Sequence, residues 1–125
     1  IKYSSSKKQL QGGKLSEFYA REAVVYIEHN YDKNITIEDV AKKCQLDRSY
    51  FGKVFKKVVG QSPQDFLIRY RMTKAADALI VGNDSISDIG NSVGYPNLLH
   101  FSRAFKGVYG MSPREYRQKN KIIDR

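Results

Sequence analysis

The sequence predicts an all-α protein in which a long central helix joins two helix-turn-helix subdomains. Apolar residues recur at helical spacing along most of the 125 residues. Residues 37–66 and 86–116 also repeat one template, at an offset of 49 positions early in the repeat and 50 positions later. Each copy closes with a Gly-x-Ser-Pro sequence, in which glycine ends one helix while serine and proline begin the next.

The N-terminal part of the chain divides into a linker and a first helix. Residues 1–15 are rich in Ser, Lys and Gly and lack periodic apolar positions, which is typical of a flexible linker. Because the chain begins with Ile rather than Met, we expect this linker to follow an N-terminal domain outside the sequence. The first helix is expected at residues 16–30, with an apolar stripe formed by Phe18, Ala23, Val24, Ile27 and Tyr31.

Each copy of the repeat is expected to form a short helix, a turn and a second helix. Thr36 with Asp39, and Ser85 with Asp88, carry the spacing of a capping box, so the short helices begin there. The matched positions of the two copies are Ile37 and Ile86, Val40 and Ile89, Cys44 and Val93, Leu46 and Tyr95, Phe51 and Phe101, Phe55 and Phe105, Lys56 and Lys106, Val58 and Val108, Gly60 and Gly110, Ser62 and Ser112, and Pro63 and Pro113.

Small residues lie where the repeat needs them. Ala41 and Gly90 occupy the position at which the two helices of each motif are expected to cross closely. Gly94 is expected to supply the positive φ of the second turn. Gln45 holds the matched place in the first turn, where a positive φ costs some strain.

The central helix should run from Ser62 to about residue 81, because Gly82 and Asn83 break the helical pattern. The last helix is expected to end near Lys119. The resulting organisation is a first lobe at 16–61, a linker helix at 62–81, a second lobe at 82–119 and a frayed tail at 120–125.

The charge of the chain favours a polyanionic partner. It has 22 Lys plus Arg against 13 Asp plus Glu, a formal net charge of +9 and a pI near 9.7. Nucleic acid and an anionic membrane surface both fit this excess, and so does a basic protein without such a partner. No apolar run approaches the roughly 18 residues of a membrane span, so we expect no membrane insertion.

Catalysis and metal binding find little support in the composition. The single Cys44 excludes an internal disulfide and a cysteine-based zinc site, and its apolar position favours a small buried residue. His29 and His100 lie too far apart to indicate a metal site. We therefore expect no catalytic residues, no metal and no cofactor, and hence no enzyme activity.

The second helix of each copy separates into a core face and an outer face. Phe51, Val54, Phe55 and Val58, with the matched Phe101, Ala104, Phe105 and Val108, are expected in the core. Cations recur on both outer faces, Lys53 with Arg103 and Lys56 with Lys106. One such face would indicate only a solvated helix, but its repetition favours two DNA-reading helices. The central helix, about 28 Å long, would hold them near the roughly 34 Å spacing of successive major grooves.

Donor geometry assigns roles to these side chains. Arg103 can donate both hydrogen bonds of its fork to guanine O6 and N7, and Lys53 can do so less rigidly. Leu99 either contacts a thymine methyl or is an ordinary surface leucine, and Asn97 either contacts a base or caps its helix. Ser49 and Ser102 are short enough to serve bases or phosphates. The expected phosphate contacts are Arg48, Lys56, Lys57 and Lys106, together with the helix N-termini at Ser62 and Ser112.

The segments Gly94-Tyr95, Phe101-Ser102-Arg103-Ala104-Phe105-Lys106, Gly110-Met111-Ser112-Pro113 and Tyr116-Arg117, together with the duplication, resemble the AraC/XylS family of bacterial transcription regulators. The likeness covers residues 16–119. It implies seven helices in two lobes and base contacts from two recognition helices, carried here to Ser49, Gly52, Lys53, Leu99 and Arg103. Gly52, Leu98 and Leu99 depart from the longer or more polar side chains that members often present.

The resemblance also implies a biological setting. It implies a bacterial cytoplasmic regulator associated with the nucleoid, with double-stranded DNA as partner and activation favoured over repression. We expect RNA polymerase as a further partner and a small-molecule effector that acts only through an N-terminal domain. Two alternatives stay open from the residues alone: sequence-tolerant nucleic-acid binding, and a module that docks to another protein.

Overall fold

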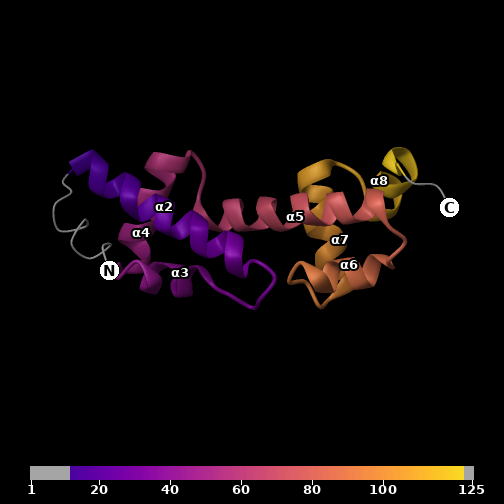
Figure 1. The fold of residues 1–125 in the computed structure, drawn as a ribbon, viewed down its shortest axis with the longest axis horizontal. Coiled ribbons are helices and arrows are strands. Elements are labelled where there is room, and N and C mark those ends of the chain that lie inside the picture. Colours follow the sequence, from indigo (N-terminus) through magenta and orange to yellow (C-terminus); the bar gives the residue numbers. More distant parts are fainter. Residues whose placement is uncertain (1–11, 123–125) are drawn as a thin grey trace. The chain divides into compact units, whose positions relative to one another are not determined.

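The computed structural model describes residues 12–122, and within that range every regular element is a helix (Figure 1). The seven helices are α2 (Gly12–Asn30), α3 (Ile37–Lys43), α4 (Arg48–Val59), α5 (Pro63–Val81), α6 (Ile86–Ser92), α7 (Leu98–Tyr109) and α8 (Pro113–Asn120). They confirm the predicted all-α class and the two helix-turn-helix motifs with a long helix between them.

The first helix begins earlier than the sequence indicated. α2 starts at Gly12 rather than at Ser16, so part of the expected linker is helical. Two successive glycines disfavour a helix, which placed the predicted start too late. Residues 1–11, the rest of that linker, lie outside the described residues.

The described residues form two compact units. Unit 1 combines residues 12–30 with Ile35–Phe66, and unit 2 combines Tyr31–Asn34 with residues 67–122. The short loop Tyr31–Asn34 therefore packs in unit 2, although it joins α2 to α3, which both belong to unit 1.

Unit 1 places α2 against α3 and α4 around an apolar core (Figure 1). Ala23 and Ile27 of α2, Val40 of α3, and Phe51 and Phe55 of α4 are fully buried. Cys44 is also buried, as a small apolar residue at the end of α3. Val58 was expected in this core, but 39% of it is exposed, so that assignment was wrong. It lines a shallow surface groove with Val24 and Val59.

The turns of the two motifs have matching backbone geometry. The N–H of Leu46 donates to the carbonyl of Ala41 at 3.0 Å, and the N–H of Tyr95 donates to that of Gly90 at 2.8 Å. Gln45 has φ 62° and the matched Gly94 has φ 96°, which confirms the expected positive φ at both turns.

The helix ends follow the repeat as well. Gly60 and Gly110 both adopt the left-handed conformation that ends α4 and α7. Thr36 forms a complete capping box with Asp39, as predicted. Ser85 accepts a hydrogen bond from the N–H of Asp88.

The core of unit 2 consists of buried residues from α5, α6 and α7 and from the turn that follows α6. Its members are Met72, Ala75, Ala76, Leu79, Ile89, Val93, Phe101 and Phe105. Gly90 lies directly against the ring of Phe101: a Cβ at Gly90 would be 2.8 Å from Phe101 Cγ. Only glycine therefore fits at this crossing of α6 and α7.

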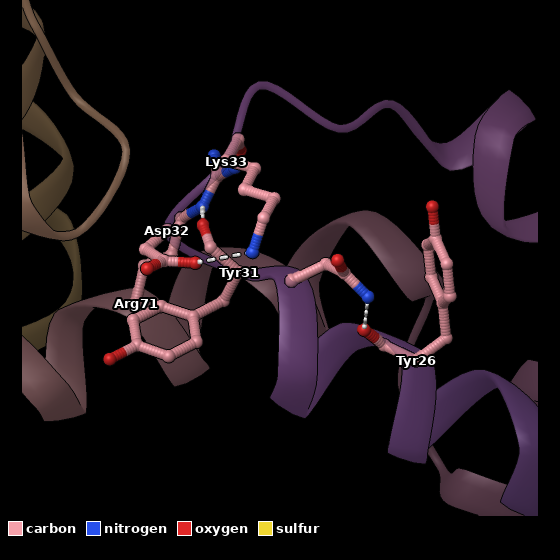
Figure 2. A network of polar contacts seen from close by, with 6 residues as sticks. Tyr26, Tyr31, Asp32, Lys33 and Arg71 are labelled. Carbon is pink, nitrogen blue, oxygen red and sulfur yellow. Dashed lines mark hydrogen bonds and ion pairs between the residues drawn. The ribbon is translucent and has the colours of Figure 1, made fainter.

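A buried cation connects three segments within unit 2. Arg71 of α5 is 9% exposed, and its Nε and Nη2 donate to the carbonyls of Tyr31 and Lys33 at 2.8 and 2.9 Å (Figure 2). Its guanidinium carbon lies 5.6 Å from the centre of the Tyr95 ring. Burial lowers the pKa of Arg71, and the neighbouring Tyr95 opposes that shift. One side chain thus joins α5, the loop Tyr31–Asn34 and the turn before α7.

The end of α5 is closed by basic residues from the C-terminal segment. Arg117 Nε donates to the carbonyl of Leu79 at 3.0 Å, and Lys121 Nζ donates to that of Gly82 at 2.6 Å. The N–H of Ile122 donates to the carbonyl of Ile80 at 3.1 Å. These contacts complement the negative end of the helix dipole. Of the tail expected to fray at 120–125, Asn120 therefore lies in α8, and Lys121 and Ile122 are hydrogen-bonded to the end of α5. Residues 123–125 lie outside the described residues.

Candidate DNA-binding surface

The outer face of α4 is polar and cationic. Asp47 caps this helix by accepting a hydrogen bond from the N–H of Tyr50 at 2.9 Å. Burial of Phe51, Val54 and Phe55 turns the opposite side of α4 to the solvent. The predicted contact residues on that side are Arg48, Ser49, Gly52, Lys53, Lys56 and Lys57, all of them exposed except the half-buried Gly52.

The outer face of α7 repeats the cations Lys53 and Lys56 of α4 as Arg103 and Lys106. Phe101 and Phe105 are fully buried, which turns Leu99, Arg103 and Lys106 outward, while Ser102 is half-buried. The faces differ in the first turn, where Leu98 and Leu99 replace Arg48 and Ser49 of α4, and at the end, where Gly107 replaces Lys57. The structure thus brings the predicted residues together as two separate faces, one on each motif.

The cations on these faces are available to an external partner. The structure shows an ion pair between Lys33 and Asp32 at 3.7 Å. Within residues 12–122, no carboxylate forms an ion pair with the cations of α4 or with Arg103 and Lys106 of α7. Lys106 is close enough to Glu115 to help lower the pKa of that carboxyl, but it forms no ion pair with it. Positive charge without an ion-pair partner attracts phosphate groups.

The two predicted phosphate sites at helix N-termini already carry local hydrogen bonds. Ser62 accepts one from the N–H of Asp65 at 3.1 Å. At Ser112, the N–H donates to Oε1 of Glu115 at 2.9 Å, and the hydroxyl accepts from the N–H of Glu115 at 3.1 Å. These bonds with Ser112 lower the pKa of the Glu115 carboxyl. A phosphate at Ser112 would compete with this carboxylate.

Asn97 caps α7, because its side-chain oxygen accepts a hydrogen bond from the N–H of His100 at 3.0 Å. Gly52 faces open space, with no atom within 4 Å of a Cβ built there. Tyr50 and Leu98, which were not among the predicted contact residues, are 51% and 47% exposed in the first turns of α4 and α7. The match of Leu98 to Arg48 in the repeat was the available signal for Leu98, whereas Tyr50 matches His100, for which no contact was predicted.

Two helix-turn-helix motifs that each present a cationic helix face define a protein of the nucleic-acid-binding class. The family model described as a helix-turn-helix domain matches residues 40–119. The lactose operon transcription activator of Staphylococcus xylosus is 45% identical over 95 residues, covering 76% of this chain and 34% of that protein. The chain belongs to the AraC/XylS family of helix-turn-helix transcription regulators.

Solved structures with the same fold include two relatives. The C-terminal domain of AraT, a response regulator from Geobacillus stearothermophilus, is 33% identical with a TM-score of 0.82, covering 85% of this chain and 88% of that one. A transcriptional regulator of the AraC type from Chromobacterium violaceum is 26% identical with a TM-score of 0.76, covering 87% and 97%.

The chain spans about a third of the length of the curated relatives it matches. Within residues 12–122, no helix combines the length and apolar character that crossing a bilayer requires.

Proposed function

We propose that this chain binds double-stranded DNA with sequence specificity and serves as the DNA-binding part of a transcription regulator. The observation that carries the proposal is the matched pair of cationic outer faces on α4 and α7. Both faces lie on the second helix of a helix-turn-helix motif, which is the helix that enters the major groove in such proteins.

In this proposal the two helices occupy successive major grooves. The 19 residues of α5 correspond to about 28 Å at ~1.5 Å per residue, close to one helical turn of DNA. Arg103 and Lys53 would read base edges, with Ser49, Ser102 and Leu99 beside them. Arg48, Lys56, Lys57 and Lys106 would neutralise phosphates and set the register.

Selection of binding sites from a random DNA pool tests this function. We expect two short enriched blocks, separated by about 10 base pairs. The selected site should bind at least ~1,000-fold more tightly than random DNA at moderate salt. Equal affinity for selected and random DNA would instead indicate sequence-tolerant binding, and no binding at all would indicate a protein-docking module.

Arg103→Ala is expected to weaken binding to the selected site and to relax the preference at one base pair. A bidentate contact from arginine to guanine contributes roughly 1–3 kcal/mol of discrimination, so the loss should be about 5- to 150-fold at that site. Competition binding against sites altered at single positions measures it. Arg69→Ala is the charge-matched control, since Arg69 is exposed on α5. Equal losses on selected and random DNA would contradict base reading by Arg103.

Lys56→Ala is expected to weaken binding to every sequence by a similar factor. A phosphate contact carries no sequence information, and its loss should reduce the slope of log K against log salt by about 1. Fluorescence anisotropy titrations at four or more salt concentrations measure both quantities. An unchanged slope, or a loss confined to the selected site, would show that Lys56 does not neutralise a phosphate.

The regulatory part of the proposal concerns the whole protein. The relative from Staphylococcus xylosus is named as an activator, which favours activation, through contact with RNA polymerase, over repression. An effector would act through the part of the protein that this chain does not span. The proposal includes no catalytic role.

A further inference from the structure

Two adjacent leucines are exposed at the start of the reading helix of unit 2. Leu98 is 47% and Leu99 is 57% exposed, although α7 buries Phe101 and Phe105 completely. Neither leucine belongs to the core of unit 2 or to the residues packed against it. Exposed apolar side chains this large on a helix face indicate a contact outside the folded chain when they adjoin a binding surface.

The position of these leucines makes that contact part of the DNA surface. Arg103 lies one helical turn after Leu99, and Lys106 follows on the same face. Both cations are exposed, and neither forms an ion pair with a carboxylate within residues 12–122. A partner that covers the leucines must therefore also accept positive charge, which fits a phosphate-lined groove better than an apolar protein surface.

The comparison between the two motifs supports a specific role. Arg48 and Ser49 occupy the matched positions of α4, where they can donate hydrogen bonds. Leucine donates none, so α7 must discriminate through shape and apolar contact in its first turn. Beyond this turn, Lys53 and Lys56 are matched by the cations Arg103 and Lys106, whereas Lys57 is matched by Gly107.

The major groove offers one apolar group at the base edge, the C5-methyl of thymine. The cap that Asn97 makes to the N–H of His100 fixes the first turn of α7, so both leucines are presented from a defined backbone. We propose that Leu98 and Leu99 form a methyl-reading pair that selects thymines in the half-site bound by unit 2. This inference rests on the proposed function, of which it specifies the base preference.

Replacing thymine by deoxyuridine in the selected site tests the pair directly, because it removes the methyl and keeps every hydrogen-bonding group. Deoxyuridine in the block bound by α7 should weaken binding about fourfold per contacted methyl, the factor that corresponds to one buried carbon group. The same replacement in the block bound by α4 is the matched control and should change little. Effects confined to the α4 block would overturn the proposal.

The variant Leu98→Ala/Leu99→Ala completes the experiment. Alanine is a good helix former and both positions are exposed, so the helix content measured by circular dichroism should be kept. This variant should bind the thymine and deoxyuridine sites with equal affinity. If the wild type also bound both sites equally, the methyl-reading role would be overturned. Specific binding by that wild type would leave the proposed function intact, whereas no specific binding at all would refute both.

Analytical ultracentrifugation of the DNA-free proteins tests whether this face instead binds a second copy of the protein. Wild type and the double variant should have the same oligomeric state in the absence of DNA. If the wild type formed an oligomer and the double alanine variant were monomeric, the leucines would belong to a protein–protein contact, and the proposal would be overturned.

Discussion

Replacing Gly90 by alanine is expected to destabilise unit 2 by about 1–3 kcal/mol, the usual cost of inserting a carbon into a packed core. The new Cβ would lie 2.8 Å from Cγ and 2.9 Å from Cδ2 of the Phe101 ring. That ring is fully buried and packs against Phe105 and Tyr95, so it has little room to move. Urea unfolding followed by circular dichroism measures the change in the free energy of unfolding.

The repeat supplies a matched control for this variant. Ala41 occupies the same position in unit 1 and is buried with its Cβ in place. Ala41→Gly should therefore cost only the ~1 kcal/mol of a glycine inside a helix, plus the small void that it leaves. If Gly90→Ala proved as stable as wild type, the crossing of α6 and α7 would be looser than the structure indicates.

Arg71→Ala is expected to lower the free energy of unfolding of unit 2 by about 1.5–3 kcal/mol, because two part-buried carbonyls lose their charged donor. The two acceptors are the carbonyls of Tyr31 and Lys33, held at 2.8 and 2.9 Å. Arg71→Lys keeps the charge but cannot reproduce the fork, so it should recover only part of the loss. Hydrogen exchange of the loop Tyr31–Asn34 would report local release of the same contacts.

Arg69→Ala is the control, since this exposed cation lies on the same helix and its removal changes the net charge equally. A surface substitution of this kind usually stays within about 0.5 kcal/mol of wild type. Equal effects of the Arg69 and Arg71 variants would mean that charge, rather than the hydrogen bonds of Arg71, stabilises this part of unit 2.

The duplication made most of the fold readable from the sequence. Because the same caps, turn positions and apolar spacing occur twice, each copy supports the interpretation of the other. The positive φ at Gln45 shows the strength of this signal, since glutamine alone would not indicate it, whereas its match to Gly94 does.

The features that escaped prediction depend on contacts distant in sequence. Arg71 follows Leu67 by four residues on a buried stripe of α5, a place where a cation needs partners. Those partners are carbonyls about 40 positions away, which no local pattern specifies. Likewise, Val58 and Val108 match in the repeat, yet Val58 is exposed, whereas Val108 packs against the core of unit 2.

The grouping of the loop Tyr31–Asn34 with unit 2 affects how the chain can be dissected. A fragment that started at residue 67 would contain the second motif but would lack the loop Tyr31–Asn34, whose carbonyls Arg71 binds. A fragment that ended at Phe66 would contain this loop but would lack Arg71, which binds it. Unit 2 is therefore discontinuous in sequence. To study it alone, the loop Tyr31–Asn34 would have to be fused to the fragment that starts at residue 67, or added as a separate peptide.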